Sequence, residues 1–141
     1  MLWTAPPSAE QLCEVLERVR PRSVYVFALE GQRDDPTTFL KLLGGMVKYA
    51  MRTSAQPSAA RLAARLGQTD AVIRKALAWL EAKGLSRVKE AADGSLALGE
   101  GGIPDEDRAM RIESEIRALL EETSAYRRYL HRASTGELLP R

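Results

Sequence analysis

The stretch from Leu66 to Leu85, LGQTDAVIRKALAWLEAKGL, decides the fold that this sequence predicts. Thr69 can cap a helix, apolar residues then recur at helical spacing, and Gly84 ends the pattern. A shorter helix precedes it and ends at Gly67, with its inward positions at Leu62, Ala63 and Leu66. Two helices separated by such a short turn are typical of a helix-turn-helix.

The neighbouring segments extend this motif. Residues 85–89 (LSRVK) and 95–99 (SLALG) flank the turn sequence at 92–94 (ADG), a pattern that predicts a β-hairpin. Before the motif, the apolar spacing over residues 39–51 predicts one more helix. Three helices followed by a hairpin make a winged helix, which we place at residues 36–99.

The first 35 residues predict a strand-helix-strand segment. Residues 2–5 (LWTA) and 23–29 (SVYVFAL) have the composition of strands. Between them, Ser8 and Gln11 form a capping box, and the helix that follows carries an apolar stripe of Leu12, Val15, Leu16 and Val19. The order favours parallel pairing of the strands through a right-handed crossover. Two strands do not make a stable sheet alone, so either another part of the chain completes it or the chain belongs to a longer protein.

Residues 100–141 predict an acidic loop, a long helix and a frayed tail. The helix spans Pro104 to His131, and the acidic residues at its start favour the helix dipole. The expected fold class is therefore α+β. It comprises a parallel strand-helix-strand segment at 1–35, a winged helix at 36–99 and a C-terminal helical segment at 100–141, packed as one compact unit.

Composition and charge limit the class of protein. The 141 residues are 45% hydrophobic and 28% charged, as in globular domains. No apolar run could span a membrane, the start lacks a signal-peptide pattern, and a single cysteine, Cys13, excludes an internal disulfide. We therefore expect a cytoplasmic protein with no membrane partner. The net charge is only +2, but residues 57–89 hold seven bases and two acids, whereas residues 90–107 hold six acids and no base.

The sequence shows no set of residues suited to catalysis or metal binding. Its only histidine, His131, lies near the predicted end of the last helix, and the common metal, nucleophile and phosphate-loop motifs are absent. Asp34 and Asp35 are adjacent acids in a turn without a partner cluster. We expect no catalytic residue, no metal site, no cofactor and no enzymatic activity from this chain on its own.

Nucleic-acid binding is the chemistry that the basic middle of the chain indicates. In a winged helix, basic side chains on the second helix of the motif and on the hairpin contact phosphates. A long polar side chain on that helix can reach the edge of a nucleobase. The candidate nucleic-acid-binding residues are Arg61, Arg65, Gln68, Thr69, Arg74, Lys75, Arg87 and Lys89. This interpretation requires the cationic side of residues 69–83 to stay open to a polyanion. Trp3 and Trp79 could stack on bases, but packing is the expected role of Trp79.

The order of these segments resembles the C-terminal domain of RecJ-type exonucleases, which are specific for single-stranded DNA. The resemblance spans nearly all of residues 2–131 and rests on LWTAPPS, RPRSVYVF, FLKLLGGMVKYA and ALLEETSAYRRYL, with the patterns RP-x-x-V-Y and S-x-x-R-x-Y-L. It implies an accessory role, either DNA handling or partner docking, in 5′ to 3′ degradation of single-stranded DNA during recombination and repair.

The same resemblance implies partners. The family holds manganese or magnesium with an Asp-His-His motif and further aspartates in upstream catalytic domains, and none of those positions lies in this sequence. We expect these domains on the same or a split polypeptide, and single-stranded DNA rather than duplex as the nucleic acid. Two other functions stay open. A free-standing winged-helix transcription regulator would dimerise, with the long last helix as the dimer element, and a protein-interaction winged helix would bind no nucleic acid.

Overall fold

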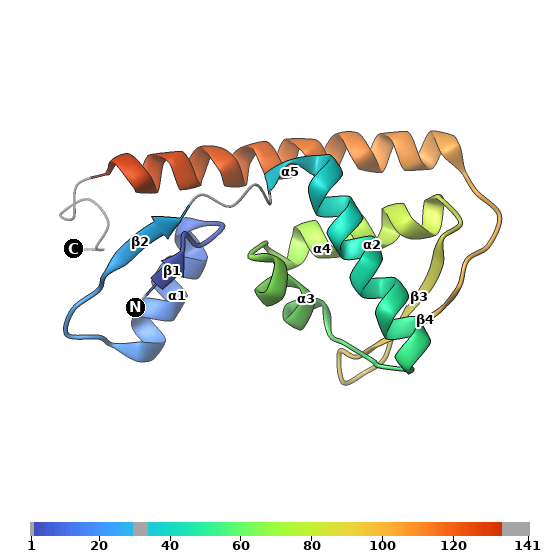
Figure 1. Ribbon diagram of the computed structural model, residues 1–141, viewed down its shortest axis with the longest axis horizontal. Helices are drawn as coiled ribbons and strands as arrows, with labels where there is room; N and C mark the ends of the chain where they lie inside the picture. The colour runs from blue at the N-terminus through green and yellow to red at the C-terminus, as the bar shows by residue number, and fades with distance from the viewer. Residues whose placement is uncertain (1, 30–33, 134–141) are drawn as a thin grey trace.

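A computed structural model describes residues 2–29 and 34–133 of the chain (Figure 1). Within these residues the fold is mixed α+β and mostly helical, which confirms the expected class at that level. The elements in chain order are β1 (Leu2–Thr4), α1 (Ala9–Val19), β2 (Val26–Leu29), α2 (Pro36–Thr53), α3 (Ala59–Leu66), α4 (Asp70–Ala82), β3 (Ser86–Glu90), β4 (Leu96–Glu100) and α5 (Glu106–Arg132). None of the described helices is long and apolar enough to cross a membrane. The tail predicted to fray beyond Ala133 lies outside the described residues.

Side-chain caps set where the described helices begin. Each cap accepts a hydrogen bond from the backbone N–H three residues further on, which satisfies a donor that the first helical turn leaves without a partner. The caps are Ser8, Asp35, Ser58, Thr69 and Asp105. The bond from Thr38 to Asp35, at 2.8 Å, also holds the pKa of the Asp35 carboxyl below its ordinary value.

One hydrophobic core joins α2, α3, α4, the β3–β4 hairpin and α5. Its largest fully buried apolar side chains are Phe39, Leu43, Ile73, Leu96, Ile116 and Leu120. The hairpin pairs in antiparallel register, from Ser86 opposite Glu100 to Glu90 opposite Leu96. α5 lies along α4 (Figure 1), and the contact between these two helices is the most extensive in the described part of the fold. One flank of α4 is therefore covered by α5.

The N-terminal segment forms a smaller unit beside this core. β1 pairs with β2 in parallel, and α1 packs Leu12 and Leu16 against Leu130 of α5. Val15 and Val19 are exposed, so the prediction that they belong to a buried stripe is wrong. The physical reason is that α5 covers only the Leu12 side of α1, and no other described element covers the two valines.

Arg127 of α5 connects the smaller unit to the core. Its guanidinium donates to the backbone carbonyl of Ala5 at 3.2 Å and to that of Gly67, and it forms an ion pair with Asp34. The two side chains of this pair are only 17% and 14% exposed. Gln68 also donates to Asp34, at 2.8 Å. The Arg127 side chain thus ties together the end of β1, the approach to α2 and the turn between α3 and α4.

Candidate nucleic-acid interface

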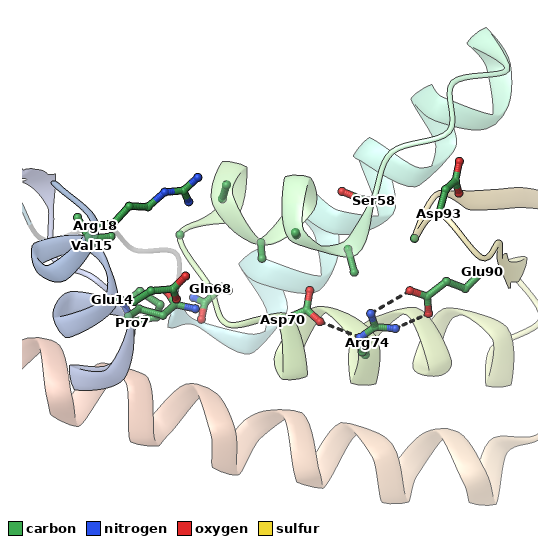
Figure 2. Close-up of a pocket in the computed structure, with 17 residues that line it drawn as sticks. Pro7, Glu14, Val15, Arg18, Ser58, Gln68, Asp70, Arg74, Glu90 and Asp93 are labelled. Atoms are coloured by element: carbon green, nitrogen blue, oxygen red, sulfur yellow. Dashed lines mark hydrogen bonds and ion pairs between the residues drawn. The ribbon is translucent and has the colours of Figure 1, made fainter.

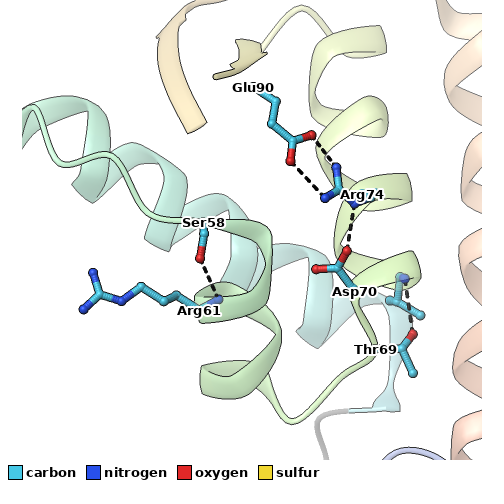
Figure 3. Close-up of polar contacts among 7 residues, drawn as sticks. Ser58, Arg61, Thr69, Asp70, Arg74 and Glu90 are labelled. Atoms are coloured by element: carbon cyan, nitrogen blue, oxygen red, sulfur yellow. Dashed lines mark hydrogen bonds and ion pairs between the residues drawn. The ribbon is translucent and has the colours of Figure 1, made fainter. Parts of the chain in front are cut away.

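Arg74 points outward from α4 but lies between two acids (Figure 3). Its Nε donates to Asp70 Oδ2 at 2.8 Å, and its Nη2 donates to Glu90 Oε1, at the end of β3, at 2.9 Å. A second bond joins Nη1 to Glu90 Oε2, so the pair with Glu90 is bidentate. The bonds to Glu90 and then to Asp70 raise the pKa of the Arg74 guanidinium, and the same contact lowers the pKa of the Glu90 carboxyl.

The lysines near Arg74 are paired as well. Lys75 forms an ion pair with Glu115 of α5, and Lys83 Nζ lies 2.7 Å from Glu106 Oε2. The side chains of Arg74 and Lys75 are 50% and 47% exposed, so solvent reaches them although both charges have partners. The expectation that the cationic side of residues 69–83 stays open to a polyanion is therefore not met, because Asp70 of α4, Glu90 of β3 and two acids of α5 pair with its cations.

Gln68 and Thr69 are used within the fold. Gln68 is only 2% exposed and its amide nitrogen donates to Asp34, so this side chain is turned into the fold and not toward a base edge. The Thr69 hydroxyl accepts from the backbone N–H of Val72, at 3.3 Å, as the cap of α4. Both side chains lie in the turn between α3 and α4, where the spacing of residues does not show which side chains face inward.

The other predicted contacts lie on exposed surface in two separate places. Arg61 and Arg65 are on α3, and Arg61 points away from Arg74 and Glu90 (Figure 3). Arg87 and Lys89 are on β3 and border a shallow hollow of about 620 Å³ on the hairpin. Within the part of the chain that the structure describes, Arg61, Arg87 and Lys89 form no ion pair. The structure does not bring the two pairs together around α4.

Trp79 is partly buried against the core, as expected for a packing role. The Lys83 ammonium lies 6.0 Å from the centre of its ring, near the outer limit of a cation–π contact. The side chain of Trp3 lies outside the described residues. Base stacking therefore finds no support at Trp79.

A groove of about 830 Å³ separates α1 from α3 and the start of α4 (Figure 2). Its wall on α3 consists of small side chains, chiefly alanines, and its charged lining holds more acids than bases. The acids are Glu14, Asp70, Glu90 and Asp93, and the bases are Arg18 and Arg74. Because Arg74 is already paired with two of these acids, the groove does not favour a phosphate group.

Comparison of the chain with protein-family models, with curated proteins and with solved structures gave no match. Among the described residues, no group of three or more His, Cys, Asp or Glu side chains could hold a metal ion.

The outer face of α2 carries basic residues that are not among the candidates predicted from the sequence. Lys41, Lys48 and Arg52 are exposed, and among the residues described none of the three forms an ion pair. A signal was present in the sequence, since residues 36–69, which cover α2 and α3, contain five bases and no acid. The basic segment at residues 57–89 does not include these side chains, because it begins after α2.

Proposed function

We propose that this chain is a non-catalytic, DNA-handling accessory domain of the kind that its resemblance to RecJ-type exonucleases implies. The observation that carries the proposal is the run of five bases without an acid over residues 36–69. On α2 and α3, four of these bases, Lys41, Lys48, Arg52 and Arg61, are exposed and form no ion pair with any described residue. Unpaired cations on a stable scaffold attract a polyanion at long range.

A winged helix is the architecture that we propose for this scaffold. Its three helices are α2, α3 and α4, and its wing is the β3–β4 hairpin. The short turn between α3 and α4, with Gly67 at φ 63° and Thr69 as the next cap, supports a helix-turn-helix. In this proposal α4 has a structural role, because α5 and Glu90 engage its outward bases.

The parallel strands β1 and β2 support a second part of the proposal, attachment to a catalytic partner. Within the described residues each strand pairs only with the other, so each has one edge without a strand partner. Strand edges of this kind can pair with a neighbouring sheet. We assign this position to upstream catalytic domains of the same or a split polypeptide, which would supply the nuclease chemistry and its metal ions.

The ion pairs of α4 favour one alternative, a protein-interaction domain that binds no nucleic acid. The regulator alternative has less support, because α5 uses Ala109, Ile116 and Leu120 inside the fold and offers no continuous apolar stripe for a dimer. We therefore retain DNA handling as the first proposal and protein docking as the second.

The test is binding of the full chain to a fluorescent single-stranded oligo-dT, measured by anisotropy between about 50 mM and 200 mM salt. We expect binding at low salt, with a logarithmic slope near −0.7 for each phosphate contacted. A folded sample that fails to bind at the lowest salt, or binds with no salt dependence, overturns DNA handling and leaves protein docking.

A further inference from the structure

We propose that the outer face of α2 is the surface that binds single-stranded nucleic acid. In this assignment Lys41, Lys48 and Arg52 contact phosphates, Tyr49 stacks on a base, and Gly45 lets the strand come close to the helix. The inference rests on the proposed DNA-handling function and locates it away from α4, the helix that the sequence pattern favours.

Helix geometry places the basic side chains of Lys41, Lys48 and Arg52 on one narrow face of α2. At 100° per residue, positions 41, 48 and 52 fall within an arc of about 40°, and Gly45 lies about 20° beyond it. The buried residues of α2, among them Leu43 and Val47, lie on the opposite side. Lys41 and Arg52 are about 16 Å apart along the axis at 1.5 Å per residue. The three basic side chains therefore form a line along the helix, and successive phosphates of a nucleic-acid backbone can follow such a line.

Charge distinguishes this face from that of α4. α2 and α3 contain no acid at all, so nothing on these two helices competes with a polyanion for Lys41, Lys48 and Arg52. On α4, each cation must first break an ion pair with Asp70, Glu90 or Glu115. A polyanion gains more free energy where the cations are unpaired, because no existing pair is lost.

Tyr49 adds an aromatic surface beside these bases. Its side chain is 65% exposed although the ring is large and mostly apolar, and it lies about 80° around the helix from Lys41. Leu42, also exposed, is on the same flank. Exposed aromatic rings next to a cationic track are the platforms on which unpaired bases stack. Because bases in a duplex are already stacked on one another, Tyr49 favours a single strand.

Gly45 is an independent observation on the same face. Glycine inside a helix lowers helix stability compared with alanine, and its missing side chain leaves room for a ligand to approach the backbone closely. A Cβ at Gly45 would meet no atom within 4 Å, whereas one at Gly44 would lie 3.9 Å from Leu80 Cδ2. The surface at Gly45 is therefore open among the described residues, and a nucleic-acid strand on α2 could lie close to the helix there.

The first experiment compares three charge variants of the full chain in the oligo-dT assay. Lys41→Gln/Lys48→Gln/Arg52→Gln should lose about tenfold or more in affinity at low salt, and its salt slope should fall by about 2. Arg108→Gln/Arg111→Gln/Arg128→Gln removes the same charge from exposed positions on α5 and should change both quantities much less. If Arg87→Gln/Lys89→Gln abolishes binding while the α2 variant does not, the interface is on the hairpin and the inference fails.

The second experiment distinguishes a lost contact with nucleic acid from a loss of protein stability. Tyr49→Leu should weaken binding by about fivefold without changing the salt slope. Gly45→Gln should raise the thermal midpoint, because glutamine favours helix more than glycine does, yet it should lower affinity. Ala118→Gln, at an exposed position of α5, is the control and should leave affinity unchanged. A Gly45→Gln protein that binds as tightly as wild type overturns the close approach of the strand.

The outcomes also separate this inference from the function on which it rests. A wild-type chain that binds no oligo-dT at low salt defeats the DNA-handling proposal and, with it, the inference. A wild-type chain that binds oligo-dT while all α2 variants bind equally well defeats the inference alone. Equal affinity for poly-glutamate and oligo-dT, with no effect of Tyr49→Leu, indicates an acidic protein partner instead and also overturns it.

Discussion

Arg74 and Lys48 are both exposed on helices, but the charges around them differ. Arg74 lies between Asp70 and Glu90, whereas α2 and α3 bring no acid to Lys48. An exposed ion pair adds little to the free energy of folding. It nevertheless occupies the cation, because a polyanion must displace the existing partner. At the scale of residues, the placement of the acids decides which basic side chains already have an ionic partner.

Replacing Glu90 with glutamine tests the pair with Arg74 through its pH dependence. The folded-state pKa of Glu90 is lowered, so the stabilisation is complete above the ordinary glutamate value near 4.5 and is lost as the pH falls below it. The thermal midpoint of wild type should therefore exceed that of Glu90→Gln at about pH 7, and the difference should shrink toward about pH 3. Glu121→Gln is the control. A difference that stays constant with pH contradicts this account.

The same variant also reports on α4 as a DNA-binding helix. Glu90→Gln leaves Arg74 with Asp70 as its remaining acid partner, so the cation becomes easier to displace. If the oligonucleotide binds to α2, the affinity of Glu90→Gln for oligo-dT should equal that of the wild type. A large gain in affinity would instead place α4 at the interface.

At the scale of elements, α4 could be predicted from the sequence, but the packing of α5 against it could not. The Thr69 cap, the apolar spacing and Gly84 are local signals, and Ile73 and Leu77 are buried as that spacing predicts. The approach of α5 is not local, since Glu115 is forty residues beyond Lys75. Helix periodicity shows which face is apolar, but it does not show which distant element will lie beside the polar face.

The N-terminal helix illustrates the same limit. The Ser8 cap could be predicted because it depends on residues one turn apart. The exposure of Val15 and Val19 could not, because it depends on how many strands and helices are available to cover α1. The inward direction of the Gln68 side chain could not be predicted for a similar reason, since its partner Asp34 lies 34 residues earlier in the chain.

Ile116→Ala tests the packing of α5 against the core. Ile116 is fully buried, so its truncation should lower the free energy of unfolding by about 2–5 kcal/mol. Met110→Ala, at an exposed position on the same helix, should change it by no more than about 0.5 kcal/mol. Urea denaturation followed by circular dichroism measures both. Equal effects of the two substitutions would contradict the docking of α5.

At the scale of the whole molecule, α5 connects two hydrophobic clusters. Ile116 and Leu120 belong to the larger cluster and Leu130 to the smaller one, and Figure 1 shows α5 running along the length of the fold. The Arg127 side chain reinforces this connection through hydrogen bonds to Ala5 and Gly67. Among the described residues, α5 and the hydrogen bonds of Arg127 hold the N-terminal unit against the core.

Arg127→Met tests whether that polar centre couples the two units. Methionine keeps an apolar stem but removes every donor, so Ala5 loses its tie and Asp34 loses its cation. Amide hydrogen exchange in α1 should increase, while α4 keeps its protection. Arg128→Met, at the next and exposed position, is the control. Unchanged exchange in α1 would show that Leu12 and Leu130 alone hold the unit.

The length of α5 has a mechanical consequence. Its 27 residues form a stiff rod of about 40 Å. If a nuclease domain joins at β1–β2 and single-stranded nucleic acid binds to α2, this helix keeps the site of cleavage and the site of binding at a constant distance from each other. The domain would then fix the number of nucleotides between the two sites. Insertion of whole helical turns into α5 would increase that number.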